Sequence, residues 1–96
     1  MIRPDDVTPA GASAPLRAPF GERLAAAMAA QGPLCMGIDP HARLLTDWGL
    51  ADTDQGLETF SLRSLEAAAA EGVAAIKPQV ALYERHGSSG LSLIHI

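Results

Sequence analysis

Two charged residues, each placed at the end of a short apolar run, are the strongest candidates for chemistry in this sequence. Asp39 follows the apolar residues 34–38, and Lys77, the only lysine in the chain, follows residues 73–76. An aspartate and a lysine that the fold brings together could form a substrate site. A charge at the end of a strand is also often the first solvated residue of a loop. The spacing alone gives these two interpretations about equal weight.

The segments around these charges predict alternating helices and strands. Pro19 and Gly32 bound an amphipathic helix. Its apolar face consists of Phe20, Leu24, Ala27 and Met28. Residues 34–38 follow as a strand, and the next loop is expected to cover one end of a core with three apolar residues. These are Leu44, Leu45 and Trp48, of which Trp48 is interpreted as a packing residue.

A second helix separates the two predicted strands. It is expected to begin at the possible caps in residues 52–54 and to end at Gly72. Its core face carries Leu57, Phe60, Leu65 and Ala68. Residues 73–77 form the second strand, and Pro78 suits the first turn of a third helix that ends at Gly87. Two residues of this third helix are expected to face inward: Val80 and Tyr83.

Two short strands joined by one helix are typical of a βαβ unit, which belongs to the α/β fold class. The strands of such a unit are parallel, and its crossover is right-handed. Parallel strands have their carboxyl ends at the same edge of the sheet, where α/β folds bind substrates. Since neighbouring strands lie about 4.8 Å apart, Asp39 and Lys77 are expected to interact directly or through a substrate.

Length and charge restrict the classes of protein that fit. The 96 residues allow one small domain, and a net charge of -4 without a basic cluster argues against nucleic acid as a partner. No apolar stretch approaches the roughly 18 residues of a membrane span, and no signal or transit peptide is visible. We therefore expect no membrane partner and a cytoplasmic location. The single cysteine, Cys35, is expected to be a small buried residue.

The histidines do not predict a metal site. His41, His86 and His95 lack metal-ligand spacing, and no cysteine or acid completes a zinc motif with them. His41 lies close to Asp39 and could belong to the surroundings of the site, but an ordinary loop histidine is the favoured interpretation.

Three runs of residues resemble one enzyme family. GPLCMGIDPHARLL, the helix after DQGLETF and IKPQVALYERHGSSG are similar, in order and spacing, to the N-terminal part of orotidine 5′-phosphate decarboxylase. The likeness is to the bacterial subgroup common in actinobacteria, and it covers about residues 20–90. It implies that residues 19–90 form the first third of a (β/α)8 TIM barrel. That third would consist of the N-terminal helix, a βαβ unit and the start of the next helix.

The resemblance also implies an activity and roles for both charges. The family converts orotidine 5′-phosphate into uridine 5′-phosphate and carbon dioxide in pyrimidine synthesis, as a homodimer without cofactor or metal. Asp39 matches an aspartate that contacts the substrate near its ribose, and Lys77 matches a lysine in a network of alternating charges. Fixed charges aimed at the charge that develops in the transition state lower the barrier. Lys77 is expected to hold that array in place beside a carboxylate.

The chain departs from the family pattern beyond these residues. The charge network normally continues with Asp-x-Lys-x-x-Asp, whose lysine protonates carbon 6 of the pyrimidine, and this motif is missing here. A whole barrel takes about 250 residues, so the chain is expected to be incomplete and inactive alone. Residues 1–18 are expected to form a disordered arm. Residues 91–96, LSLIHI, resemble translated sequencing adaptor and are expected to have no structural or functional role.

Two other functions remain open from the residues themselves. A Schiff-base aldolase of the same barrel class would use Lys77, in an apolar pocket, as the covalent nucleophile. Trapping with borohydride would detect that adduct. A non-catalytic βαβ module would instead act through an exposed apolar face. Two parallel strands with three helices also leave an open sheet edge, which favours aggregation.

Overall fold

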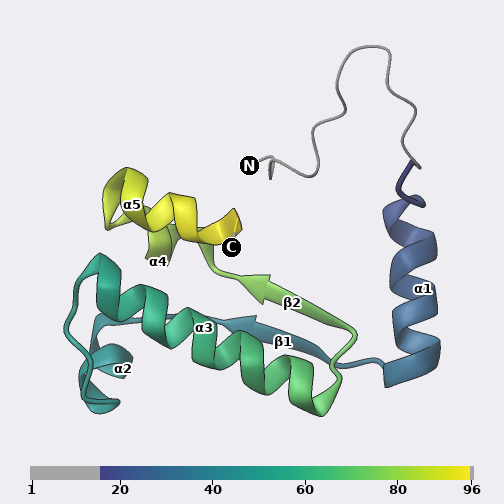
Figure 1. The fold of residues 1–96 in the computed structure, drawn as a ribbon, viewed down its shortest axis with the longest axis horizontal. Helices are drawn as coiled ribbons and strands as arrows, with labels where there is room; N and C mark the ends of the chain where they lie inside the picture. The colour runs from purple at the N-terminus through teal and green to yellow at the C-terminus, as the bar shows by residue number, and fades with distance from the viewer. Residues whose placement is uncertain (1–15, 96) are drawn as a thin grey trace.

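A two-stranded parallel sheet with one long helix packed across it forms the centre of the molecule (Figure 1). The structure is a computed structural model that describes residues 16–95. Strand β1 (Cys35–Ile38) pairs in parallel with β2 (Ala75–Pro78), and helix α3 (Asp54–Glu71) lies between them in sequence. The predicted βαβ unit with parallel strands is therefore confirmed. Most of the arm predicted for residues 1–18 lies outside the described residues.

The remaining helices lie at the two ends of this sheet. Helix α1 (Phe20–Gln31) precedes β1 and stands apart from the other elements, beside the amino ends of the strands (Figure 1). Helices α2 (Ala42–Asp47) and α4 (Val80–Glu84) follow the carboxyl ends of β1 and β2. Helix α5 (Gly87–Ser92) and the 3₁₀ helix η2 (Leu93–His95) complete the chain as described. Among these helices, none combines the length and the apolar composition that crossing a bilayer requires.

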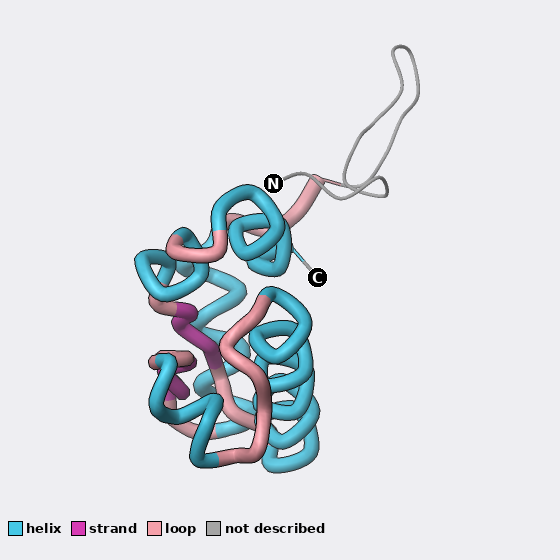
Figure 2. The backbone as a smooth tube through the Cα atoms, turned by 90° about the vertical axis from the view of Figure 1, so that its left-hand side faces the viewer, coloured by secondary structure: helices cyan, strands magenta, loops and turns pink. Residues whose placement is uncertain are grey.

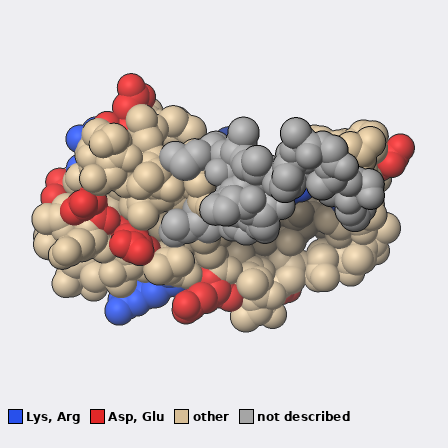
Figure 3. All heavy atoms as spheres, turned by 45° about the horizontal axis from the view of Figure 1, so that its top comes forward, with Lys and Arg blue, Asp and Glu red and all other residues tan. Residues whose placement is uncertain are grey.

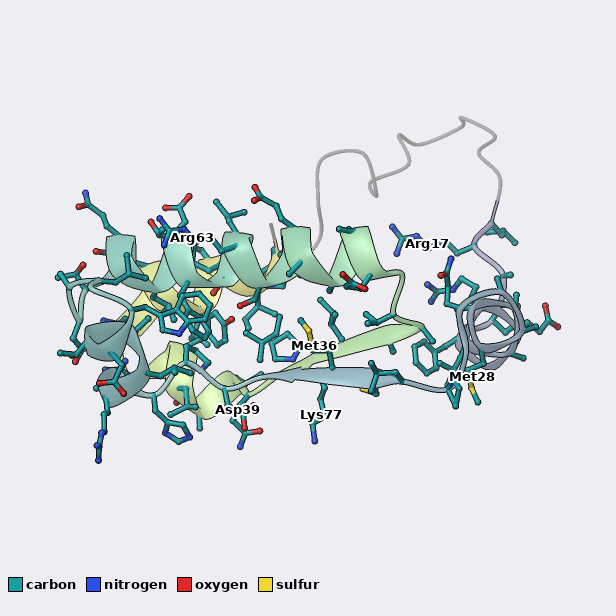
Figure 4. The ribbon with its side chains drawn as sticks, turned by 90° about the horizontal axis from the view of Figure 1, so that it is seen from below. Arg17, Met28, Met36, Asp39, Arg63 and Lys77 are labelled. Carbon is teal, nitrogen blue, oxygen red and sulfur yellow. The ribbon has the colours of Figure 1, made fainter. Side chains whose placement is uncertain are left out.

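The sheet and α3 form two layers, so only one face of the sheet is covered by a helix. Figure 2 shows the strands on one side and the long helix on the other. Side chains alternate between the two faces of a strand. Met36 therefore points toward α3, as Figure 4 shows, and Ile38 shares that face and is buried. Cys35 lies on the other face and is exposed. The prediction of a buried cysteine is wrong, because it ignored which face the helix covers.

The ends of α3 are fixed by local chemistry. The Thr53 side chain accepts a hydrogen bond of 3.1 Å from the backbone N–H of Gly56, which satisfies a donor of the first turn. A Cβ atom at Gly56 would collide with the carbonyl oxygen of Ala51, so glycine lets the preceding loop pass close to the helix. At the other end, Gly72 has φ 73° and ψ 55°, the left-handed conformation that terminates a helix. The predicted start and stop of this helix are therefore confirmed.

The core lies between α3 and the carboxyl half of the sheet. Its buried residues come from β1, α2, α3 and α4, and they are Ile38, Leu45, Leu57, Phe60 and Tyr83. Trp48 stacks at a tilt on Phe60, with 4.4 Å between the ring centroids. Burial of these side chains supplies the main favourable free energy that holds the layers together.

One polar contact lies inside this core. The hydroxyl groups of Ser61 and Tyr83 are 2.8 Å apart and share a hydrogen bond between α3 and α4. Burial raises the pKa of the Tyr83 phenol above its usual value, and the negative charge of Asp39 adds to that rise. The hydrogen bond from Ser61 opposes the rise. The neutral phenol is therefore the form that the folded chain favours.

Several elements differ from the sequence expectations. The predicted loop after β1 contains the short helix α2, where burial of Leu45 outweighs the weak propensity of six residues. The third helix was predicted to end at Gly87, but α4 already ends at Glu84, and Gly87, with a φ of 67°, begins the separate helix α5. Tyr83 faces inward as predicted, but Val80 is 49% exposed. The prediction for Val80 is wrong because it lies at the start of α4, before that helix reaches the core.

Both terminal segments also differ from expectation in their packing. The amphipathic face of α1 is present, yet none of its residues is buried and Phe20 is 66% exposed, because no described element packs on it. At the other end, Leu93 and Ile94 contact the core. The expectation that residues 91–96 have no structural role is therefore wrong for Leu93 and Ile94, while the proposed origin of this segment stays a prediction.

Replacing Leu57 with alanine measures how much the packing under α3 contributes to stability. Leu57 is fully buried, so Leu57→Ala leaves a cavity, and the free energy of unfolding is expected to fall by about 2 to 5 kcal/mol. The matched control is Leu62→Ala in the same helix, where the residue is 40% exposed and the expected loss is below about 1 kcal/mol. Urea unfolding followed by circular dichroism measures both variants. Equal losses would contradict the packing described above.

Tyr83 is expected to make the folded chain less stable in strong alkali. A pKa that is raised in the folded state adds stability that is complete below the ordinary value of 10.0. That stability is lost as the pH rises through the higher folded value. Tyr83→Phe should remove this dependence. Because Tyr83 is the only tyrosine, the absorbance of tyrosinate reports its titration directly, and a midpoint at or below 10.0 would refute the expectation.

Candidate functional site

Asp39 and Lys77 lie on the same face and toward the same end of the sheet. Gly37 is the register partner of Lys77, and Asp39 follows two residues after Gly37, which places all three on one face. Figure 4 shows both charged side chains pointing away from α3. Asp39 comes directly after β1, whereas Lys77 lies within β2, one residue before its end. The two residues are therefore diagonal neighbours across the sheet.

Gly37 leaves open space between the two charges. A Cβ atom built on Gly37 would lie 3.7 Å from Oδ1 of Asp39, so the carboxylate leans back over the glycine that faces Lys77. A glycine within a strand often marks a place where a ligand or another chain approaches the backbone closely. Gly37 was not among the predicted site residues, although its position inside an apolar run was the signal that could have found it.

Asp39 and Lys77 do not form an ion pair with each other within residues 16–95. Diagonal neighbours on one face of a sheet lie about 7 to 8 Å apart, and both side chains are exposed. This separation leaves room for a polar group between them. A hydroxyl could donate to the carboxylate while an anionic group lies beside the ammonium.

The backbone around Asp39 is held on both sides. The N–H of Gln79 donates a hydrogen bond of 3.0 Å to the carbonyl oxygen of Ile38, which extends the strand pairing past the end of β1. The N–H of His41 donates a hydrogen bond of 2.8 Å to the carbonyl oxygen of Asp39, and this bond closes a tight turn around the buried Pro40. The direction of the Asp39 side chain is therefore set by a constrained turn. His41 itself is exposed and lies just before α2.

A second charged cluster lies behind this turn. Nη1 of Arg85 is 2.7 Å from Oδ1 of Asp52, and its Nη2 donates a hydrogen bond of 3.3 Å to the carbonyl oxygen of Pro40. Nε2 of His86 lies 3.3 Å from the same Asp52 oxygen but makes no hydrogen bond there. This cluster was not predicted, because Pro40, Asp52 and the Arg85–His86 pair lie far apart in the sequence.

An apolar groove with a volume of 460 Å³ runs along the free edge of β1. Its lining comes from β1, α2 and α3 and includes Met36, Leu44, Trp48, Phe60 and Ala67. Asp39 borders the groove, yet its carboxylate points away from α3, which forms the opposite wall (Figure 4). The groove therefore suits the packing of apolar side chains better than the binding of a polar ligand.

Charge elsewhere on the described surface is dispersed. On the face shown in Figure 3, acidic and basic side chains are scattered and the basic ones form no continuous patch. Within residues 16–95, no three His, Cys, Asp or Glu side chains gather closely enough to hold a metal ion. The face that carries Asp39 and Lys77 is therefore the most specific arrangement of functional groups in the described part of the chain.

Comparisons with known proteins give one consistent result. An orotidine 5′-phosphate decarboxylase from a Nocardioides species is 58% identical over 76 residues, which cover 79% of this chain and 28% of the relative. The enzyme of the same name from Streptomyces coelicolor is 55% identical over 76 residues, with 79% and 27% covered. No protein-family model matches the chain.

A solved structure agrees with these relatives. A crystal structure from Streptomyces avermitilis that carries the same enzyme name superimposes with a TM-score of 0.69 and 56% sequence identity. The match covers 79% of this chain and 26% of the solved one. The chain thus spans little more than a quarter of the length of the proteins it matches. Sequence and structure agree that it belongs to the orotidine 5′-phosphate decarboxylase family.

Proposed function

We propose that this chain is the first third of a decarboxylase barrel and that it contributes Asp39 and Lys77 to the active site. In this arrangement the face of the sheet opposite α3 becomes the interior of a (β/α)8 barrel, and the carboxyl ends of its strands bind orotidine 5′-phosphate. The observation that carries the proposal is the shared face of Asp39 and Lys77, in a chain 58% identical to a decarboxylase over 76 residues.

The uncovered parts of the sheet support an incomplete barrel. Parallel strands in α/β proteins are normally covered on both faces, but the face with Cys35, Gly37 and Ala75 has no helix over it. Each strand also has one edge without a partner among the described residues, and the apolar groove follows one of these edges. Further strands would satisfy both edges.

The two charges would act on different parts of the substrate. Asp39 would accept a hydrogen bond from a ribose hydroxyl and orient the nucleotide, which lowers the entropic cost of reaching the transition state. Lys77 would lie beside the carboxylates of the charge network. When carbon dioxide leaves carbon 6, the bonding electrons stay on that carbon, and a cationic array compensates this charge without reorganising. The carbanion then takes a proton from a lysine outside this sequence.

The Schiff-base alternative receives less support. A Schiff-base lysine requires an apolar pocket, whereas Lys77 shares its face of the sheet with the charged Asp39, and the relatives of this chain are decarboxylases by name. The homodimeric state and the cytoplasmic location expected from the family remain part of this proposal. The substrate is a single nucleotide, and neither a nucleic acid nor a membrane is required as a partner.

The 96-residue chain alone is expected to release no carbon dioxide from orotidine 5′-phosphate, because the proton-donating lysine is missing from its sequence. A hybrid enzyme, in which residues 20–90 replace the matching segment of the Nocardioides relative, is expected to be active. Release of labelled carbon dioxide and growth of a bacterial strain that lacks its own decarboxylase measure this. The control is the same relative with the segment deleted. A folded but inactive hybrid, or an active chain alone, would contradict the proposal.

Lys77→Ala in that hybrid is expected to lower kcat by about 100-fold or more, because the substitution removes a preorganised charge from the site. If the rest of the barrel buries the partner carboxylate fully, leaving it unpaired costs about 3 to 5 kcal/mol. The matched control is Arg43→Ala, which removes a cation whose side chain is 91% exposed. Steady-state kinetics measures both variants. Unchanged turnover in Lys77→Ala would remove Lys77 from the proposed site.

A further inference from the structure

One guanidinium group joins three segments at the carboxyl end of the sheet. Arg85 follows α4, Asp52 precedes α3, and Pro40 comes directly after Asp39. Nη1 of Arg85 contacts the Asp52 carboxylate at 2.7 Å, while Nη2 donates to the Pro40 carbonyl oxygen at 3.3 Å. The planar fork of arginine can serve both acceptors at once, and the single ammonium of lysine cannot span them in the same way.

Stability alone does not explain this arrangement. The Arg85 and Asp52 side chains are 29% and 42% exposed, and ion pairs with such access to water contribute little to stability. A second arginine pair, Arg43 with Asp47, is longer at 3.9 Å and joins two turns of one helix. What distinguishes Arg85 is its hydrogen bond to the backbone of the turn that carries Asp39.

We propose that Arg85 is a positioning residue for Asp39, acting through the carbonyl oxygen of Pro40. This inference rests on the proposed function, because the direction of Asp39 matters to catalysis only if its face binds the substrate. The turn from Asp39 to His41 has its own hydrogen bond, and Gln79 holds the residue before it. Arg85 adds a hydrogen bond to the carbonyl oxygen of Pro40, and its ion pair with Asp52 connects the turn to the start of α3.

The geometry gives this bond a specific effect. Rotation of the peptide unit between Pro40 and His41 would turn the Pro40 carbonyl away from Arg85 and the His41 N–H away from the carbonyl oxygen of Asp39, which would open the turn that holds Asp39. A displacement of about 1 Å at a catalytic group can reduce the rate by up to about 100-fold. Arg85 contacts Asp52 and Pro40 and forms no ion pair with Asp39 within residues 16–95, so its effect on Asp39 passes through the turn.

Kinetics of the hybrid enzyme tests the proposal. Arg85→Gln is expected to lower kcat/KM by about 10-fold, and Arg85→Lys should not restore it because lysine lacks the fork. Arg43→Gln is the matched control, with a change below about twofold. In an Asp39→Asn background, Arg85→Gln should cause no further loss, since nothing remains to be positioned. Losses that multiply in the double variant, or full activity in Arg85→Lys, would overturn the proposal.

Amide hydrogen exchange separates this proposal from the proposed function. Arg85→Gln is expected to speed the exchange of the His41 and Gln79 amides by at least about 10-fold, because local opening of the turn becomes easier. Arg43→Gln should leave both rates unchanged. The measurement requires a folded hybrid and not an active one. Faster exchange in an inactive hybrid would support the positioning role while the proposed function fails. Unchanged exchange would refute the positioning role whatever the activity.

Discussion

The parallel pairing of β1 with β2 is the constraint on which the rest of the structure depends. Its register sets Gly37 opposite Lys77 and Ile38 opposite Pro78. A shift by one residue would move every side chain of a strand to the other face. Ile38 would then leave the core, and Asp39 would point under α3. Burial of the apolar face and exposure of the charged face are therefore two results of one register.

Hydrophobic packing determines that register, and polar contacts then refine the position of single groups. Ile38 is part of the buried core, so the end of β1 is anchored before any charge is considered. Asp39 follows directly, and the buried Pro40 restricts the turn. Hydrogen bonds from Gln79 and Arg85 then hold the backbone on either side of the carboxylate. The candidate site thus lies at the border between a rigid core and an uncovered face, which is where directional groups can be both fixed and accessible.

Local signals in the sequence predicted the main elements, because those elements depend on local chemistry. The ends of α3 follow from Thr53, which caps the first turn, and from Gly72, which ends the last one, and both residue types are recognisable helix boundaries in a sequence. The parallel sheet follows from two apolar runs joined by a helix, and it places Asp39 and Lys77 toward the carboxyl ends of the two strands. Similarity to a family raised the weight of these two residues above what their spacing alone supports.

Properties that depend on tertiary neighbours were not predictable in the same way. Cys35 and Val80 have apolar surroundings in the sequence, yet each faces a side that no described element covers. Leu45 was expected to cover the core from a loop, but its burial instead supports the short helix α2, which no local pattern predicted. The contact of Arg85 with Asp52 joins residues far apart in the chain. Such pairs become visible only when the fold has brought their loops together.

The apolar groove beside β1 has a consequence for how the molecule can be observed. Its wall includes Trp48, the only tryptophan, which stacks on Phe60 and remains 45% exposed. An indole that is half in contact with water changes its fluorescence when that water is displaced. The emission wavelength of Trp48 therefore reports whether further polypeptide covers the free edge of β1. This intrinsic fluorescence requires no added dye.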